Sequence, residues 1–174
     1  MNEAKQNIVN TPLKEDIKKK IWSILNTITD PEIPVLSVTD LGIVRGIKLN
    51  HDEIEVFITP TYSGCPAMDV ISMNIRMYLL QNGFEKIKIT HQLSPAWTTD
   101  WMTEEGKQKL RAYGIAPPVG KSFDQKYLEE ELKVECPQCG SKNSRLISQF
   151  GSTACKALYQ CKDCLEPFDY FKCH

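Results

Sequence analysis

The sequence lacks several features that would place a protein in a class at once. No apolar run approaches the roughly 20 residues that a membrane-spanning helix needs. The first residues carry no apolar signal-peptide core, so we expect a cytoplasmic protein. The formal net charge is only −1, which gives no electrostatic case for binding nucleic acid or an anionic membrane.

The usual catalytic motifs are also missing. We find no phosphate-binding glycine loop, no paired Glu-x-x-His helices for a di-iron site and no Ser-His-Asp set. These absences favour an accessory protein without direct catalytic activity over an enzyme.

The composition is that of a folded globular protein. Of the 174 residues, 41% are hydrophobic and 25% are charged, enough for one ordinary domain plus a small module. Seven cysteines in a chain without an export signal indicate metal binding or thiol chemistry and not disulfides.

Hydrophobic periodicity predicts an α+β domain over residues 13–93, a small three-stranded sheet with helices packed on it. A frayed polar segment precedes the first helix, which must end before Pro31. The turn at residues 50–52 predicts a hairpin. The expected elements are a helix at 17–28, strands at 43–49 and 53–59, a helix from 68 to 82, and a strand at 84–90.

Cys65 lies between the second strand and the following helix. Pro66 suits a first helical position, so Cys65 should lie at or near the N-cap, where free N–H groups and the helix dipole favour a thiolate. A thiolate there can attack a substrate, or it can hold a soft metal or an iron–sulfur cluster. The alternative is a buried cysteine that acts as a small hydrophobic side chain.

Three carboxylates, Asp30, Glu32 and Asp40, occur in an ordered loop at residues 29–43. In one interpretation they only start turns and cap a short helical turn. In the other, the loop lies beside Cys65 and helps to hold a metal or a cluster.

Residues 94–132 form an extension and linker with Trp97 and Trp101. Thr103 predicts the N-cap of a short helix with an acidic first turn. The two tryptophans either dock a partner or fold back on the sheet.

A zinc ribbon with strands at residues 144–150 and 154–159 is predicted over residues 133–174. Two Cys-x-x-Cys pairs about twenty residues apart, Cys136 with Cys139 and Cys161 with Cys164, make a closed four-cysteine site typical of one structural zinc per chain. A single iron fits the same pattern. When the four thiolates and the metal ion are included, the net charge of the module is close to zero. A nucleic-acid-binding module should be basic, so a protein is favoured over nucleic acid as its partner. The aromatic residues near the end of the chain either form that contact surface or pack the small core: Phe168, Tyr170 and Phe171.

Cys155, Cys173 and His174 belong to neither pair. They are either packing residues or a second thiol site. The spacing alone does not choose between the two.

These motifs together resemble a known family. Residues 13–93 are similar to the domain of iron–sulfur assembly factors of the SufT and cytosolic iron–sulfur-targeting type, on the strength of Asp30-Pro31-Glu32, Asp40-Leu41-Gly42 and the turn at Cys65-Pro66. The rest of the chain resembles the PaaD family, the D subunits of the phenylacetyl-CoA (ring 1,2-) epoxidase system. The segments that carry this second likeness are residues 97–106, 114–118, the ribbon, 150–157 and 167–174.

The resemblance implies an accessory role in aerobic phenylacetate catabolism. In that system a di-iron oxygenase subunit performs the epoxidation, and a reductase subunit with a flavin and a [2Fe–2S] centre supplies electrons. A protein of the PaaD family would assist the assembly or insertion of an iron or iron–sulfur centre in the reductase or the oxygenase.

Three hypotheses follow. In the first, Cys65 transiently holds iron or a cluster, with Asp30, Glu32 or Asp40. In the second, the protein is a non-catalytic structural adaptor in the same complex; in the third, Cys65 is the nucleophile of a thiol enzyme. A homodimer is also expected, because a three-stranded sheet leaves edges to cover.

Overall fold

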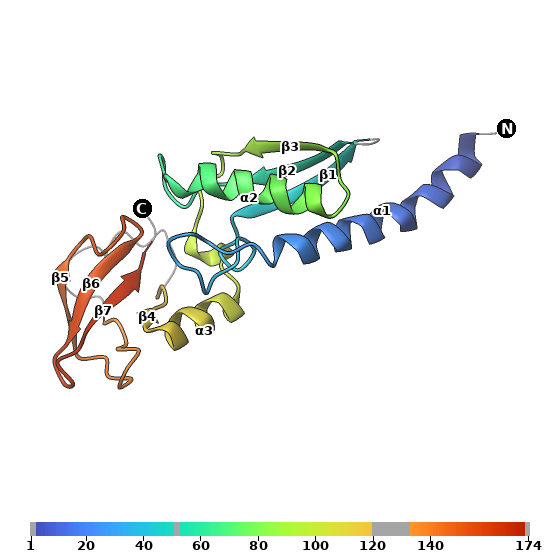
Figure 1. Cartoon of the computed structure of the whole chain (residues 1–174). Helices are drawn as coiled ribbons and strands as arrows, with labels where there is room; N and C mark the ends of the chain where they lie inside the picture. Colours follow the sequence, from blue (N-terminus) through green and yellow to red (C-terminus); the bar gives the residue numbers. More distant parts are fainter. Residues whose placement is uncertain (1–2, 51–52, 120–132, 173–174) are drawn as a thin grey trace.

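The computed structural model describes residues 3–50, 53–119 and 133–172. It contains a three-stranded sheet with two helices, a short extension and a four-stranded sheet at the C-terminal end (Figure 1). Residues 120–132 of the expected extension and linker lie outside the described residues, as do Cys173 and His174. None of the described helices is long and apolar enough to cross a membrane.

The α+β domain has the element order that the sequence predicts. The helices and strands are α1 (Glu3–Leu25), β1 (Val44–Asn50), β2 (Glu53–Ile58), α2 (Ala67–Gln81) and β3 (Lys86–His91). The sheet order is β1-β2-β3; β1 and β2 form the antiparallel hairpin, and α2 connects β2 to the parallel strand β3. Both helices run below the sheet in Figure 1, and they contact each other.

The first helix is longer than the sequence predicted. It begins at Glu3, so the segment expected to be frayed is helical. The residues at its start, Glu3-Ala4-Lys5-Gln6, are good helix formers, and they extend a helix that the apolar stripe of Ile21, Leu25 and their neighbours already holds in the core.

Both tryptophans of the extension fold back on the α+β domain. Trp97 is buried, and its indole N–H donates a hydrogen bond to the carbonyl of Leu41 at 2.8 Å. The Arg45 guanidinium of β1 stacks 3.4 Å from the centroid of the Trp101 ring. The alternative in which the two side chains form a free docking surface is therefore wrong for Trp97.

The extension continues into the C-terminal module. It comprises a 3-10 turn η1 (Thr99–Trp101), α3 (Glu104–Tyr113) and β4 (Ile115–Ala116). Thr103 is the predicted N-cap of α3, with its hydroxyl accepting the N–H of Gly106. Strand β4 then pairs with the last strand of the ribbon.

The ribbon has one strand more than the sequence analysis identified. Strands β5 (Ser144–Ser148) and β6 (Lys156–Cys161) were expected, and β7 (Pro167–Phe171) completes a sheet of order β4-β7-β6-β5. The aromatic residues of β7 are buried. Of the two expected roles, they therefore pack the core and do not form a contact surface.

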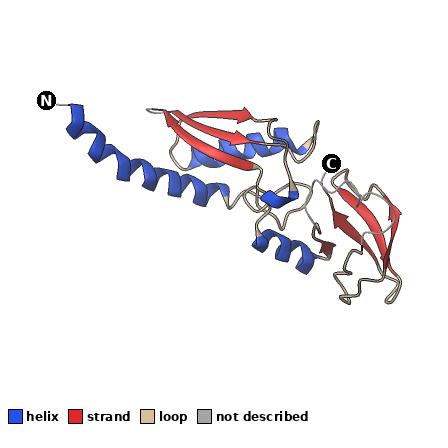
Figure 2. Ribbon diagram, turned by 180° about the vertical axis from the view of Figure 1, so that it is seen from behind, coloured by secondary structure: helices blue, strands red, loops and turns tan. Residues whose placement is uncertain are grey.

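The ribbon packs directly against the α+β domain, as both ribbon views show (Figures 1 and 2). Phe171 and Cys155 belong to the hydrophobic core of the α+β domain and not to the ribbon's own small cluster. The Phe171 ring meets Trp97 edge to face at 6.1 Å between centroids. The side of the ribbon that carries Cys155 therefore faces the earlier domain.

Gly42 shows how closely the extension approaches the acidic loop. Its φ is +66°, and a Cβ there would lie 2.3 Å from the carbonyl oxygen of Trp101. Gly64 has a similar φ of +81° with open space around it.

We expect Gly64→Ala to cost about 1–2 kcal/mol, the strain of the left-handed backbone alone. Gly42→Ala should cost at least about twice as much, because the methyl group also displaces Trp101. Urea unfolding with near-UV circular dichroism measures both. Equal losses in the two variants would contradict this close approach.

Candidate functional site

Cys65 lies one residue before the N-cap of α2, which is Pro66. The turn is closed by a hydrogen bond from the Cys65 N–H to the carbonyl of Tyr62 at 3.2 Å. Burial raises the pKa of the half-buried thiol, although hydrogen bonds from the Ala67 N–H and the Tyr62 hydroxyl oppose this. The expected position is confirmed, whereas the expectation of a favoured thiolate is wrong because desolvation outweighs the N–H groups.

Asp30 caps the loop that presents Glu32. One of its carboxylate oxygens accepts the N–H groups of Glu32 and Ile33, each at 2.8 Å, and burial raises the pKa of this carboxyl. The Glu32 carboxylate contacts a side chain of the ribbon. It reaches the Sγ of Cys155, 3.7 Å away.

Cys155 lies immediately before β6 and is buried. Its Sγ is 3.0 Å from the hydroxyl of Thr153 and faces Glu32 on the other side. Burial, with the charges of Glu32 and Asp30, raises the pKa of this thiol to about 11. Its expected neighbours Cys173 and His174 are outside the described residues.

The Tyr62 hydroxyl is hydrogen-bonded to Cys65 and interacts electrostatically with Cys155. Burial and the nearby Cys65 raise its pKa to about 12, with smaller contributions from Glu32 and Cys155. We call Cys65, Tyr62, Glu32 and Cys155 the junction cluster, because its members come from both the α+β domain and the ribbon. The sequence analysis considered Cys65 beside Glu32 as one of two interpretations and left Cys155 open between packing and a second thiol site, since a contact across 123 positions leaves no local signal.

Asp40 is held by a different set of residues. Its carboxylate accepts the Ser37 N–H at 3.0 Å, the Thr103 hydroxyl at 3.1 Å and the Lys109 ammonium at 2.9 Å. Ser37 returns the bond by accepting the Asp40 N–H, as in a capping box. These contacts fasten α3 to the loop, and the structure does not bring Asp40 into the junction cluster.

The four ribbon cysteines converge as predicted. Their Sγ atoms all lie within 4.8 Å of one another, with Cys136 to Cys164 at 3.8 Å and Cys139 to Cys161 at 3.6 Å. A tetrahedral ion with metal–sulfur bonds of about 2.3 Å requires sulfur–sulfur separations of about 3.8 Å. The Cys164 N–H also points at the Cys161 sulfur, 3.5 Å away, as expected around a metal-bound thiolate. The donor set and its geometry fit one tetrahedral metal ion.

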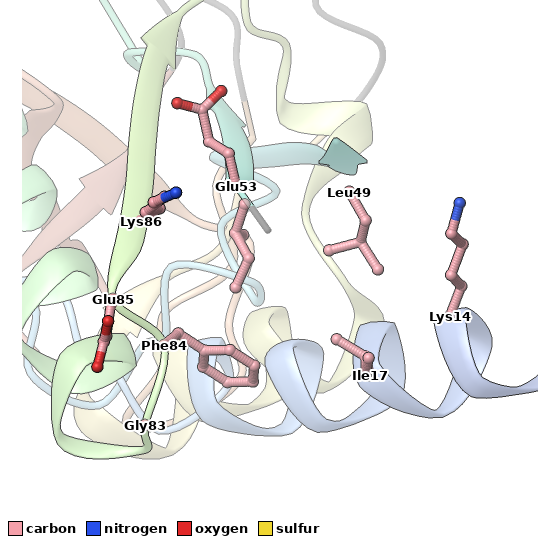
Figure 3. A pocket seen from close by; sticks show the side chains of 9 residues that line it. Lys14, Ile17, Leu49, Glu53, Gly83, Phe84, Glu85 and Lys86 are labelled. Carbon is pink, nitrogen blue, oxygen red and sulfur yellow. The ribbon is translucent and has the colours of Figure 1, made fainter. Parts of the chain in front are cut away.

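A groove of about 320 Å³ lies far from both cysteine groups, at the end of the domain where β2 begins (Figure 3). Lys14, Glu53, Glu85 and Lys86 place opposite charges around apolar side chains such as Phe84. Strand β2 runs from this groove toward the Cys65 turn, so no candidate site residue lines it.

Two protein families match the two parts of the chain. The model "iron-sulfur cluster assembly protein" matches residues 18–86, and "PaaD zinc beta ribbon domain" matches residues 121–172.

Individual relatives agree with this division. The chain is 53% identical over 154 residues to a protein of Escherichia coli (strain K12) named as the D subunit of 1,2-phenylacetyl-CoA epoxidase, covering 88% of this chain and 92% of that protein. It is 36% identical over 95 residues to an Fe-S protein maturation auxiliary factor of Porphyromonas gingivalis, covering 53% of this chain and 90% of the relative. A crystal structure of a DUF59 domain from Bacillus anthracis shares the fold, with a TM-score of 0.52 at 23% identity over 55% of this chain and 92% of that one.

The four-cysteine site yields a prediction about metal removal. The ribbon is too small for a self-sufficient core, so Cys136→Ser or a strong chelator should remove the metal and unfold β5 to β7. Hydrogen exchange should show lost amide protection in these strands and retained protection in β1 to β3. Cys65→Ser, outside the ribbon, serves as the control and should keep the ribbon metal. Unchanged protection in Cys136→Ser would contradict a structural metal.

The Asp40 contacts predict a pH dependence of stability. Burial by itself would raise the pKa of Asp40, but hydrogen bonds from Lys109 and Ser37 outweigh it and hold the pKa below its usual value. The folded state therefore binds this proton less tightly than the unfolded state. The stabilisation is present near pH 7 and is lost as the pH falls through the lowered pKa.

Asp40→Asn should thus cost about 1–3 kcal/mol near pH 7 in urea unfolding, since hydrogen bonds to a charged group are lost. It should cost clearly less at a pH of about 3. Glu105→Gln, which removes the exposed partner of Lys109, is the matched control with an expected loss under about 1 kcal/mol. A cost for Asp40→Asn that is the same at both pH values would contradict this role.

Proposed function

This chain belongs to the family of the D subunits of phenylacetyl-CoA epoxidase, and we propose that it serves that complex as a maturation factor. In this role it helps to assemble or insert an iron or iron–sulfur centre in the reductase or the oxygenase subunit. Iron or the cluster is its cargo and not a resident cofactor. The match of residues 18–86 to iron–sulfur cluster assembly proteins supports this assignment.

The observation that carries the proposal is the position of Cys65. Its thiol is half-buried just before α2 and is hydrogen-bonded to the Tyr62 hydroxyl, and its pKa is raised first by burial and to a smaller degree by the charge of Glu32. A thiol and a carboxylate that meet at a partly open surface can accept a cation and release it again. A fully enclosed set of ligands would hold the cation permanently.

The other acidic residues have supporting roles in this proposal. Asp30 fixes the loop by holding the N–H groups of Glu32 and Ile33, and so aims the Glu32 side chain. Asp40 fastens the extension to the same loop through Thr103 and Lys109. We therefore assign the cargo contact to Cys65 and Glu32.

The ribbon supplies a folded docking module in this account. Zinc is the ion we assign to Cys136, Cys139, Cys161 and Cys164, because four thiolates in closed tetrahedral geometry are typical of structural zinc. The ion would supply folding energy to strands that have little core of their own.

A second candidate function, that of a non-catalytic structural adaptor, is favoured by the ribbon surface. Four large apolar side chains are exposed there, at 39% to 68% of their full area: Leu146, Ile147, Phe150 and Leu165. Exposed apolar groups on one small module are suited to binding another subunit. An adaptor would use this surface and would not need the Cys65 thiol.

Cys65→Ser separates the two functions. Each variant is co-produced with the reductase and oxygenase subunits, and the iron and acid-labile sulfide of the purified partners are measured. Maturation predicts that the client loses most of its metal centre, a drop of about tenfold or more, while it still binds the variant. Ser63→Ala, an exposed change in the same turn, is the matched control and should leave the client fully loaded.

The adaptor function would instead be established by two results together. The client would keep its full iron content when produced with Cys65→Ser, and Leu146→Ser or Phe150→Ser would abolish complex formation. The metal content of the ribbon is measured in every variant, so that unfolding is not mistaken for loss of function.

A further inference from the structure

We propose that Cys155 of the ribbon joins Cys65 and Glu32 in one composite site for a thiophilic divalent cation, ferrous iron, at the junction of the two modules. This inference rests on the proposed function, which already assigns the cargo contact to Cys65 and Glu32. It adds a second thiol ligand, and it makes the ribbon a part of the cargo site and not only a docking module.

The first observation is where the Cys155 side chain lies. It takes no part in the four-cysteine site, and it is buried in the core cluster of the α+β domain, only 5% exposed. Its sulfur faces the Glu32 carboxylate at 3.7 Å. The thiol donates its hydrogen to this carboxylate, so two side chains that can bind a metal ion already meet across the boundary between the ribbon and the α+β domain.

The second observation is that Tyr62 places Cys65 in the same neighbourhood. The Tyr62 hydroxyl is hydrogen-bonded to Cys65, and it also interacts electrostatically with Glu32 and with Cys155. One side chain thus interacts with all three proposed ligands. The N-terminal end of α2 and the ribbon lie side by side in both ribbon views (Figures 1 and 2).

The third observation concerns the charged groups around Glu32 and Cys155. Within the described residues, the Glu32 carboxylate has no ion pair with a lysine or an arginine. The buried ammonium of Lys156 pairs with Asp169 instead, at 3.5 Å. Lys156 and Lys172 both interact electrostatically with the Cys155 thiol, but neither forms an ion pair with Glu32, and a metal ion bound there would supply that partner.

The donor set indicates which ion fits. Two thiolates with one carboxylate suit Fe²⁺ or Zn²⁺, whereas Mg²⁺ and Ca²⁺ require oxygen ligands. The three donor atoms do not all lie within 4.8 Å of one another, unlike those of the four-cysteine site, so side chains must rotate to close on the ion. Such a site binds less tightly than the ribbon site, as a cargo site should.

The test is a count of metal in the full-length protein. The ribbon is first saturated with zinc, ferrous iron is then added without oxygen, and zinc and iron are measured after removal of loosely bound metal. We expect one iron beside one zinc in the wild type. Iron affinity should fall about tenfold or more in Cys65→Ser, Glu32→Gln and Cys155→Ser, while zinc remains.

The matched control is Glu85→Gln, an exposed carboxylate away from the junction, which should bind iron as the wild type does. Zinc content and circular dichroism report whether Cys155→Ser is folded. If it is not folded, the iron affinities of the two single variants Glu32→Gln and Cys155→Ala test the composite site instead. Wild-type iron binding in folded Cys155 variants would overturn the composite site. Absence of iron binding beside the ribbon zinc in the wild type would overturn it as well.

These outcomes are distinguishable from failure of the proposed function. If Cys155 variants bind iron normally and Cys65→Ser still leaves the client empty, maturation stands and the composite site falls. If iron binding needs Cys155 but clients are loaded normally by Cys65→Ser, the site exists and the maturation role falls.

Discussion

The convergence of four thiols, in a geometry that fits one metal ion, is the constraint on which the C-terminal module depends. The ribbon's own core is a small cluster of residues, far smaller than the core of the α+β domain. A metal ion bound by these thiols would therefore contribute much of the stability of β5, β6 and β7. One side of the ribbon carries Phe171 and Cys155 into the neighbouring domain, where Phe171 meets Trp97.

A metal ion bound by the ribbon cysteines would thus also influence the geometry of the junction cluster. Cys155 directly precedes β6, the strand that ends at the metal ligand Cys161, so its place beside Glu32 follows from the position of that strand. The acidic loop is fixed from the opposite side by Asp40, which fastens it to α3, and by Gly42, which admits Trp101. These contacts hold the two modules together at the junction cluster, where Cys155 meets Glu32 without a covalent link.

Much of this was accessible from the sequence, and the failures have physical causes. Alternation and helical spacing predicted the sheet, α2 and the hairpin, and the Cys-x-x-Cys pairs predicted the metal site, because these are local patterns. Strand β7 was missed because its closely spaced aromatic residues show no clean alternation. The contact between Cys155 and Glu32 was missed because only tertiary packing creates it. The thiolate expected at Cys65 was wrong because the sequence reveals the helix start but not the burial that opposes it.

The central claim is that iron is held by sulfur from both modules. X-ray absorption at the iron edge of the iron-loaded protein tests it most directly, because the zinc of the ribbon absorbs at a different energy and does not interfere. The account predicts an iron shell of two sulfur atoms together with oxygen, reduced to one sulfur in Cys155→Ser. An iron shell of oxygen and nitrogen alone, or one with two sulfur atoms that persist in Cys155→Ser, would contradict it.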